Sequence, residues 1–135
     1  MKTKQLYING EWIDSTGNDI ADVLNPATEE VIAKVPVGTN EDVDNAVAAA
    51  KAAFPAWNAT PIEERIALME KFDEAINARK EEIADTIVAE LGAGKTFALS
   101  GQVGLPLSEI RATIDAVKGY DFKYNIENAE IIEEG

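Results

Sequence analysis

The spacing of apolar residues changes once along the chain, near residue 38, and this change constrains the fold more than any other feature. Up to Gly38 the apolar residues come in short groups separated by turn residues, which is typical of short strands. From Thr39 onward they recur every three or four positions, which is typical of helices. A length of 135 residues suits one domain. We therefore expect an α+β chain with β-hairpins over residues 1–38, helices over 39–124 and the start of a strand over 125–135.

Two hairpins are predicted in the first segment. Asn9-Gly10 lies between two apolar groups, and both residues tolerate the positive φ that a tight hairpin turn needs. Asn25-Pro26 favours a second turn. The strands expected around these turns are Leu6 to Ile8 with Trp12-Ile13, and Val23-Leu24 with Val31 to Val35.

Start and stop signals divide the helical part. Thr39 or Asn40 can cap the first helix, and Pro55 is expected to end or kink it. Thr60 followed by Pro61 predicts the start of a second helix, and Gly92 can end a third helix in a left-handed conformation. Helical periodicity assigns several large apolar side chains to the core, among them Phe54, Trp57, Met69 and Phe72. The three aromatic residues of this set could instead line a pocket.

The C-terminal part predicts one more helical region and one strand. The helical region spans Thr96 to Tyr124 and is expected to be interrupted near Gly104-Leu105-Pro106. Ala129 to Gly135 has the pattern of a strand that has only begun, with no partner after it.

Composition excludes several kinds of chemistry. The chain has no cysteine and no histidine, so it holds no thiol nucleophile, no imidazole base and no site ligated by either residue. Its net charge of −13 disfavours nucleic acid and anionic membrane surfaces as partners. No apolar run is long enough to cross a bilayer, and the first residues lack the pattern of a signal peptide. The expected compartment is the cytoplasm.

The segment Gly92-Ala93-Gly94-Lys95-Thr96 invites comparison with a phosphate-binding loop. Such a loop needs a glycine five positions before its Gly-Lys pair, where this chain has Ala89, and it follows a buried strand. The residues before Gly92 instead have helical periodicity. The simpler interpretation is the end of one helix followed by the start of the next.

Several segments, in order along the chain, resemble the aldehyde dehydrogenase superfamily. Leu6 to Trp12 resembles the opening hairpin of the family, and Asn25 to Val35 is similar to its second hairpin. Asp42 to Phe54, followed by Trp57, resembles its first helix. Further similarities are found at Arg65 and Leu68, Glu90-Leu91-Gly92, Gly104-Leu105 and Phe122.

The resemblance implies the first segment of an α/β cofactor domain, without its Rossmann strands. In such an enzyme a cysteine thiolate attacks the aldehyde, hydride passes to NAD or NADP, and a glutamate-activated water releases the acid. The strands that bind the nicotinamide cofactor, the glutamate and the cysteine all follow the matched segment. The chain by itself is therefore expected to be inactive, to contain no catalytic residue and to bind no cofactor.

The resemblance also implies two groups of site residues. Glu109 and Thr113 resemble positions that border the substrate entrance in some members, although a plain surface helix is an equal alternative. Glu90, with the carbonyls of Val23 and Leu24, resembles a monovalent-cation site seen in some members. One ligand of that site would lie beyond residue 135, so the site is expected to be incomplete.

Three interpretations follow. The first is the N-terminal portion of an aldehyde dehydrogenase, whose partners are the remainder of the enzyme or further copies in a homo-oligomer and whose parent acts on an aldehyde. The second is a truncated relative that serves as an assembly or interaction module. The third is a small nucleotide-binding protein that uses Gly94-Lys95-Thr96.

A helical layer separated from its Rossmann core should expose the apolar faces that the core normally covers, and such faces drive association. We therefore expect the 135-residue polypeptide to self-associate or to be loosely packed. Sedimentation velocity combined with thermal melting measures both properties. A monomer with a sharp, cooperative melt would contradict this expectation.

Overall fold

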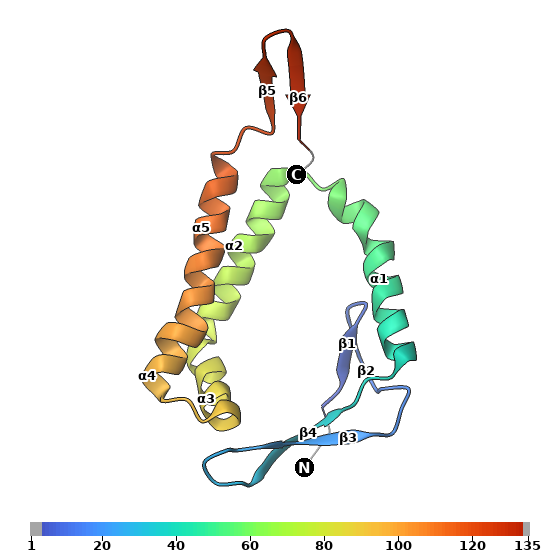
Figure 1. The fold of residues 1–135 in the computed structure, drawn as a ribbon, viewed down its shortest axis with the longest axis vertical. Helices are drawn as coiled ribbons and strands as arrows, with labels where there is room; N and C mark the ends of the chain where they lie inside the picture. Colours follow the sequence, from blue (N-terminus) through green and yellow to red (C-terminus); the bar gives the residue numbers. More distant parts are fainter. Residues whose placement is uncertain (1–3, 134–135) are drawn as a thin grey trace.

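A computed structural model describes residues 4–133 as three strand pairs and a set of helices (Figure 1). Four strands come first: β1 (Leu6–Ile8), β2 (Glu11–Ile13), β3 (Ile20–Leu24) and β4 (Val31–Pro36). The helices are α1 (Asn40–Asn58), α2 (Ile62–Ala78), α3 (Lys80–Leu91), α4 (Lys95–Phe97), the π-helix η1 (Ala98–Gly104) and α5 (Leu105–Lys118). Two strands follow, β5 (Lys123–Ile126) and β6 (Ala129–Ile132). The α+β class is confirmed.

The two N-terminal hairpins form where the turn residues predict them. Asn9 and Gly10 have φ of 54° and 81°, so the positive φ expected of a tight turn is present at both positions. Across this hairpin the rings of Tyr7 and Trp12 lie 5.0 Å apart. Strands β3 and β4 pair antiparallel, with an irregularity in register between Val23 and Leu24.

The elements enclose an open centre (Figure 1). Helices α2 and α5 pack side by side in opposite directions, and α1 lies across from them, where its main contact is with β1. The β3–β4 hairpin spans one end of the molecule, and the β5–β6 hairpin projects from the other. The chain is thus arranged as a shell.

The core of this shell is small. Ala84, Ala98, Val103 and Leu107 form a buried cluster where α3, η1 and α5 meet. Partly buried residues of α2, α3 and η1 pack around it: Ile76, Ile83, Ile87, Val88 and Leu99. No large side chain is completely buried among the described residues. The packing that holds the helices together is therefore concentrated at one end of the α2–α5 pair.

The surface of the chain is much larger than that of a compact protein of the same mass. The accessible area is 10007 Å² for a chain of 14.6 kDa. A compact monomer of that mass exposes about 6,900 Å². The excess of about 3,000 Å² carries aromatic residues that helical periodicity assigned to the core. Phe54, Trp57 and Phe72 are 63%, 43% and 52% exposed, so their prediction as core residues is wrong for this chain.

The start of α1 is held by a buried carboxylate. Thr39 is the N-cap, as predicted, and it forms a capping box with Asp42. The Asp42 carboxylate also accepts hydrogen bonds from the Ser15 hydroxyl at 2.5 Å and from the Thr16 backbone N–H at 3.0 Å. These contacts fasten the turn after β2 to the first turn of α1. The hydrogen bond from Ser15, followed by those from Thr39 and Thr16, holds the pKa of Asp42 well below its usual range.

The second helix starts where the sequence predicts it, since α2 begins at Ile62 directly after Thr60-Pro61, but two details of this junction differ. Pro55 does not end the first helix, since α1 continues to Asn58. Thr60 does not cap the second helix, because its hydroxyl donates to the carbonyl oxygen of Ala56 at 2.9 Å. Pro61 occupies the N-cap of α2 instead, without a side-chain hydrogen bond. The Thr60 hydroxyl therefore serves the end of α1 and not the start of α2.

The C-terminal region also differs from expectation. Helix α5 ends at Lys118 and not at Tyr124, and it follows η1 without an interruption at Gly104-Leu105-Pro106. Strand β6 has a partner, because residues 123–126 form β5 and pair with it in an antiparallel hairpin. The Tyr120 and Tyr124 hydroxyls both donate to the Glu133 carboxylate, which lowers the pKa of Glu133 and raises the pKa of each tyrosine. The base of this hairpin is thereby tied to the end of α5.

The depressed pKa of Asp42 predicts an acid-dependent loss of stability. The stabilisation is present above the pKa of an unfolded aspartate, about 3.9, and is lost as pH falls below it. We expect Asp42→Asn to flatten the fall in unfolding free energy over this acid range, as measured by urea denaturation. Asp44→Asn, an exposed neighbour on α1, is the control. Equal pH profiles for the two variants would contradict the role of Asp42.

Candidate functional site

An apolar groove runs between α2 and α5 and is closed at one side by the end of α1. Its volume is about 360 Å³. Its apolar lining consists of Trp57, Ile62, Ile66, Met69, Ile110, Ile114 and Val117, and its polar lining consists of Arg65, Glu109 and Thr113. Most of its lining is therefore apolar.

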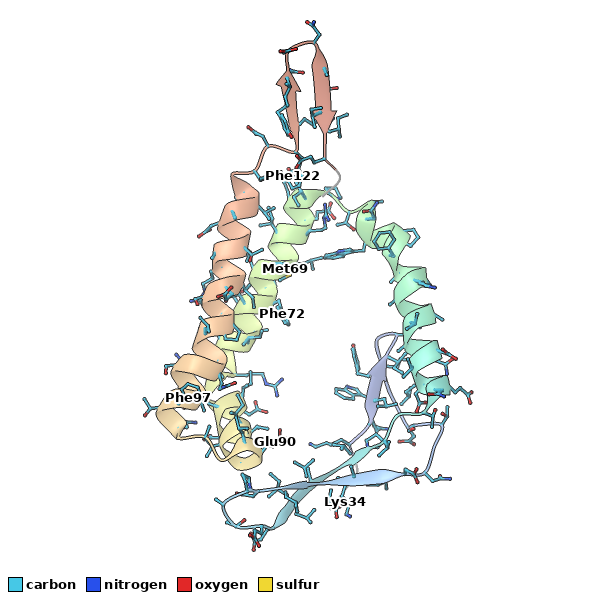
Figure 2. All side chains as sticks on the ribbon, viewed as in Figure 1. Lys34, Met69, Phe72, Glu90, Phe97 and Phe122 are labelled. Carbon is cyan, nitrogen blue, oxygen red and sulfur yellow. The ribbon has the colours of Figure 1, made fainter. Side chains whose placement is uncertain are left out.

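The groove forms because the apolar side chains of α2 and those of α5 are only partly in contact with one another. On α5, Ile110, Ile114 and Val117 recur at helical spacing, and of these only Ile114 is buried. On α2, Met69 and Phe72 lie on the side toward α1 and remain exposed (Figure 2). The two helices thus share one seam of contact and leave the rest of their apolar stripes uncovered.

Two ion pairs join α2 and α5 next to the groove. The Arg111 guanidinium lies 3.0 Å from the Asp73 carboxylate, and the Lys118 ammonium lies 2.6 Å from the Glu70 carboxylate. The hydrogen bond to Glu70 raises the pKa of Lys118. Both pairs join α5 to α2 along the edge of the groove.

The structure places Glu109 and Thr113 together on the groove. They lie one turn apart on α5 with exposed side chains, and the Thr113 hydroxyl donates to the Glu109 backbone carbonyl at 2.8 Å. The Glu109 carboxylate is therefore the acidic group at this rim, while the Thr113 hydroxyl is engaged within the helix.

The three residues of the expected cation site come from two elements, α3 and β3. Glu90 lies in the last turn of α3 (Figure 2), whereas Val23 and Leu24 lie in β3 at the irregularity of its pairing. A Cβ added at Gly92 would meet Pro26 at 2.8 Å, so the turn after β3 lies against the end of α3. Over residues 4–133 no group of three or more metal-binding side chains is present. The carbonyls of β3 would have to supply the other ligands.

The segment 92–96 has the geometry of two helix ends. Gly92 has φ of 72° and closes α3 in the left-handed conformation, and Gly94 is the N-cap of α4. The Lys95 ammonium lies 2.5 Å from the Asp85 carboxylate and 3.1 Å from that of Glu81. Its pKa is raised, chiefly by the hydrogen bond to Asp85. Lys95 thus binds two carboxylates of α3, and a helix stands where a phosphate loop requires a strand.

Trp57 and Arg65 belong to the groove. From the sequence, a pocket was the lesser alternative for Trp57, and Arg65 had no site role. Helical periodicity assigned Trp57 to the core, and Met69 likewise, because a half-exposed apolar stripe has the same spacing as a buried one. No signal within the sequence separates the two cases. The position of Asp42 three residues after Thr39 is compatible with a capping box, so this part of its role could be read from the sequence. Its hydrogen bonds to Ser15 and Thr16 depend on tertiary contact and could not.

Comparison with known proteins places the chain in a family. The sequence model of the aldehyde dehydrogenase family matches residues 12–131. A Staphylococcus aureus protein assigned to the aldehyde dehydrogenases is 42% identical over 121 residues, which are 90% of this chain and 25% of that protein. The chain belongs to the aldehyde dehydrogenase family. It corresponds to the N-terminal portion of such a protein and spans about a quarter of the length of the curated relatives that it matches.

Solved structures of the family share this conformation. The aldehyde dehydrogenase of Bartonella henselae is 36% identical with a TM-score of 0.90, and the match covers 96% of this chain and 27% of that one. Aldehyde dehydrogenase C of Pseudomonas syringae, solved with NAD+ and octanal, is 38% identical with a TM-score of 0.89 and is covered to 26%. The open shell is therefore the conformation that the matching segment has within much longer chains.

The carboxylate partners of Lys95 predict that Gly94-Lys95-Thr96 binds no nucleotide. We expect the melting temperature of the polypeptide to be unchanged by ATP with Mg²⁺. A ligand present at one hundred times its dissociation constant would stabilise the fold by about 2.7 kcal/mol. A saturable rise in melting temperature that Lys95→Ala removes would contradict this prediction.

Proposed function

We propose that this chain is the N-terminal part of an NAD(P)-dependent aldehyde dehydrogenase that oxidises an aldehyde to a carboxylic acid. The observation that carries the proposal is the agreement of nearly the whole chain, in sequence and conformation, with one quarter of such enzymes. An oligomeric enzyme in the cytoplasm is the setting that we propose for it. No helix among residues 4–133 is long and apolar enough to cross a membrane.

The chain alone is proposed to be inactive. With no cysteine in its sequence, it cannot supply the thiolate that attacks an aldehyde in this chemistry. Among residues 4–133 Asp42 is the buried acidic residue, and its carboxylate is occupied by hydrogen bonds at the start of α1. The reactive groups must come from the remaining part of the enzyme.

The glycine-containing segment of this chain does not fit a dinucleotide. The glycine-containing segment 92–96 follows a helix, and its lysine is bound to Asp85 and Glu81. The positive charge and free backbone donors that a pyrophosphate needs are therefore not assembled there. NAD or NADP belongs to the proposed activity of the whole enzyme, and this chain supplies no part of the cradle.

Two smaller roles are part of the proposal. Glu109 and Thr113 border the substrate entrance of the whole enzyme, where the apolar groove beside them would suit the hydrocarbon part of an aldehyde. Glu90 and the carbonyls of Val23 and Leu24 supply part of a monovalent-cation site, supported by the contact between the turn after β3 and the end of α3.

A second candidate function is an interaction module that binds a partner without catalysis of its own. The exposed area of 10007 Å² favours this candidate, because a chain with so much uncovered surface is suited to association. The two candidates differ in whether the chain supports turnover when it is joined to the catalytic part of a relative.

A chimeric enzyme tests the proposed function. Residues 1–135 are fused to the Staphylococcus aureus relative in place of its matching quarter, and NAD(P)H formation from aldehydes is measured. We expect turnover within about tenfold of the parent relative, equivalent to about 1.4 kcal/mol in the barrier. The 135-residue chain alone is the control and should show none. A folded chimera without turnover, or turnover by the chain alone, would contradict the proposal.

A further inference from the structure

We propose that Asn9, in the turn between β1 and β2, is a site of spontaneous deamidation that converts this position to aspartate and isoaspartate. In this reaction the backbone nitrogen of the following residue attacks the side-chain carbonyl carbon of the asparagine, and water completes the conversion. The modification depends only on the β1–β2 turn and is independent of the proposed function.

The sequence around Asn9 differs from that around every other asparagine of the chain. Asn9 alone is followed by a glycine. Glycine has no Cβ beside its nitrogen and has the widest conformational freedom, so its nitrogen reaches the preceding side chain most easily. The other asparagines precede residues with side chains, and Asn25 precedes Pro26, which has no N–H. Several of them are also held within α1 and α2.

The turn leaves the reacting groups uncovered. Strand β1 ends at Ile8, which pairs with Glu11 at the start of β2, so the Gly10 N–H takes no part in the strand pairing. Both turn residues are exposed, and a Cβ added at Gly10 would meet no atom within 4 Å. Water and hydroxide therefore have access to the Gly10 nitrogen and to the Asn9 side chain.

The hairpin is short enough to open locally. Each of its strands has three residues, and a two-stranded hairpin gains little stability by itself. Its main contact with the rest of the chain is between β1 and α1 (Figure 1). Local opening releases Asn9 from its left-handed conformation, at φ of 54°, without unfolding the helices. The attacking geometry is therefore available while the remainder of the chain stays folded.

The reaction balances with water as its only co-reactant. Hydroxide takes the proton of the Gly10 nitrogen, and this nitrogen forms a bond to Cγ of Asn9. The bond from Cγ to Nδ2 breaks, and ammonia leaves with a proton taken from water, which restores the hydroxide. Water then opens the five-membered imide. Cleavage of the new bond gives aspartate, and cleavage of the original peptide bond gives isoaspartate.

Isoaspartate is the product that changes the hairpin. It carries the main chain through its own side chain and so lengthens the turn by a methylene group. A tight turn then no longer matches the pairing of Ile8 with Glu11. We expect the rings of Tyr7 and Trp12, 5.0 Å apart across the same hairpin, to separate. Aspartate tolerates the left-handed conformation and preserves the turn.

Ageing of the purified 135-residue chain tests the proposal. The chain is incubated at mildly alkaline pH, and its peptides are analysed by mass spectrometry with fragmentation that distinguishes isoaspartate from aspartate. We expect position 9 to react before every other asparagine, faster as pH rises, and to yield isoaspartate. A synthetic peptide of residues 6–13 is the reference. An intact Asn9 after the peptide has been converted, or earlier reaction of another asparagine, would overturn the proposal.

Two variants test the chemistry of the turn. Asn9→Gln cannot form the five-membered imide and should lose the product. Gly10→Ala places a Cβ beside the attacking nitrogen, and we expect the reaction to slow at least about tenfold. Alanine is strained at the φ of 81° found at this position, so the variant opens the hairpin more easily and cannot slow the reaction by tightening the turn. An unchanged rate in either variant would overturn the proposed route.

Tryptophan fluorescence tests the structural consequence. The measurement uses a Trp57→Phe background, in which Trp12 is the only tryptophan. We expect the emission of Trp12 to shift as isoaspartate accumulates. Freshly prepared Asn9→Asp has the added charge with an unaltered main chain, so its spectrum should stay close to that of the unaged chain. An unchanged spectrum in the isoaspartate-containing chain would overturn the proposed effect on the hairpin.

Discussion

Apolar surface must be covered for a protein to be stable in water, and this chain covers only part of its own. Its buried cluster is built from small and medium residues where α3, η1 and α5 meet, while Phe54, Trp57 and Phe72 remain exposed. Burial of such side chains is the main favourable contribution to folding. The small buried cluster and the exposed apolar side chains together distinguish this chain from a compact domain.

Local interactions hold the shell in shape despite its small core. The Asp42 carboxylate fastens the turn after β2 to the first turn of α1, and Glu133 fastens the last hairpin to the end of α5 through Tyr120 and Tyr124. Short-range polar contacts of this kind position elements precisely enough for larger surfaces to match. They contribute less to stability than a full core does.

This segment lacks the residues that the proposed reaction needs. A chain without cysteine or histidine cannot perform the nucleophilic step, and its Gly94-Lys95-Thr96 segment has a structural role in joining α3 to α4. What this segment of the family provides is surface: a groove between two helices joined by ion pairs, with Glu109 and Thr113 at its rim.

The sequence by itself determined the elements whose signals are local. Asn9-Gly10 predicted the first hairpin because both residues accept positive φ, Thr39 predicted the start of α1 through its cap, and Gly92 predicted the end of α3. Two local details were predicted wrongly: Pro55 does not end α1, and the Thr60 hydroxyl donates to the carbonyl oxygen of Ala56 four residues earlier and does not cap α2. The tertiary structure alone decided which apolar stripes are covered. Helical spacing is the same for a buried stripe and an exposed one, so only the arrangement of α1, α2 and α5 in space revealed the groove.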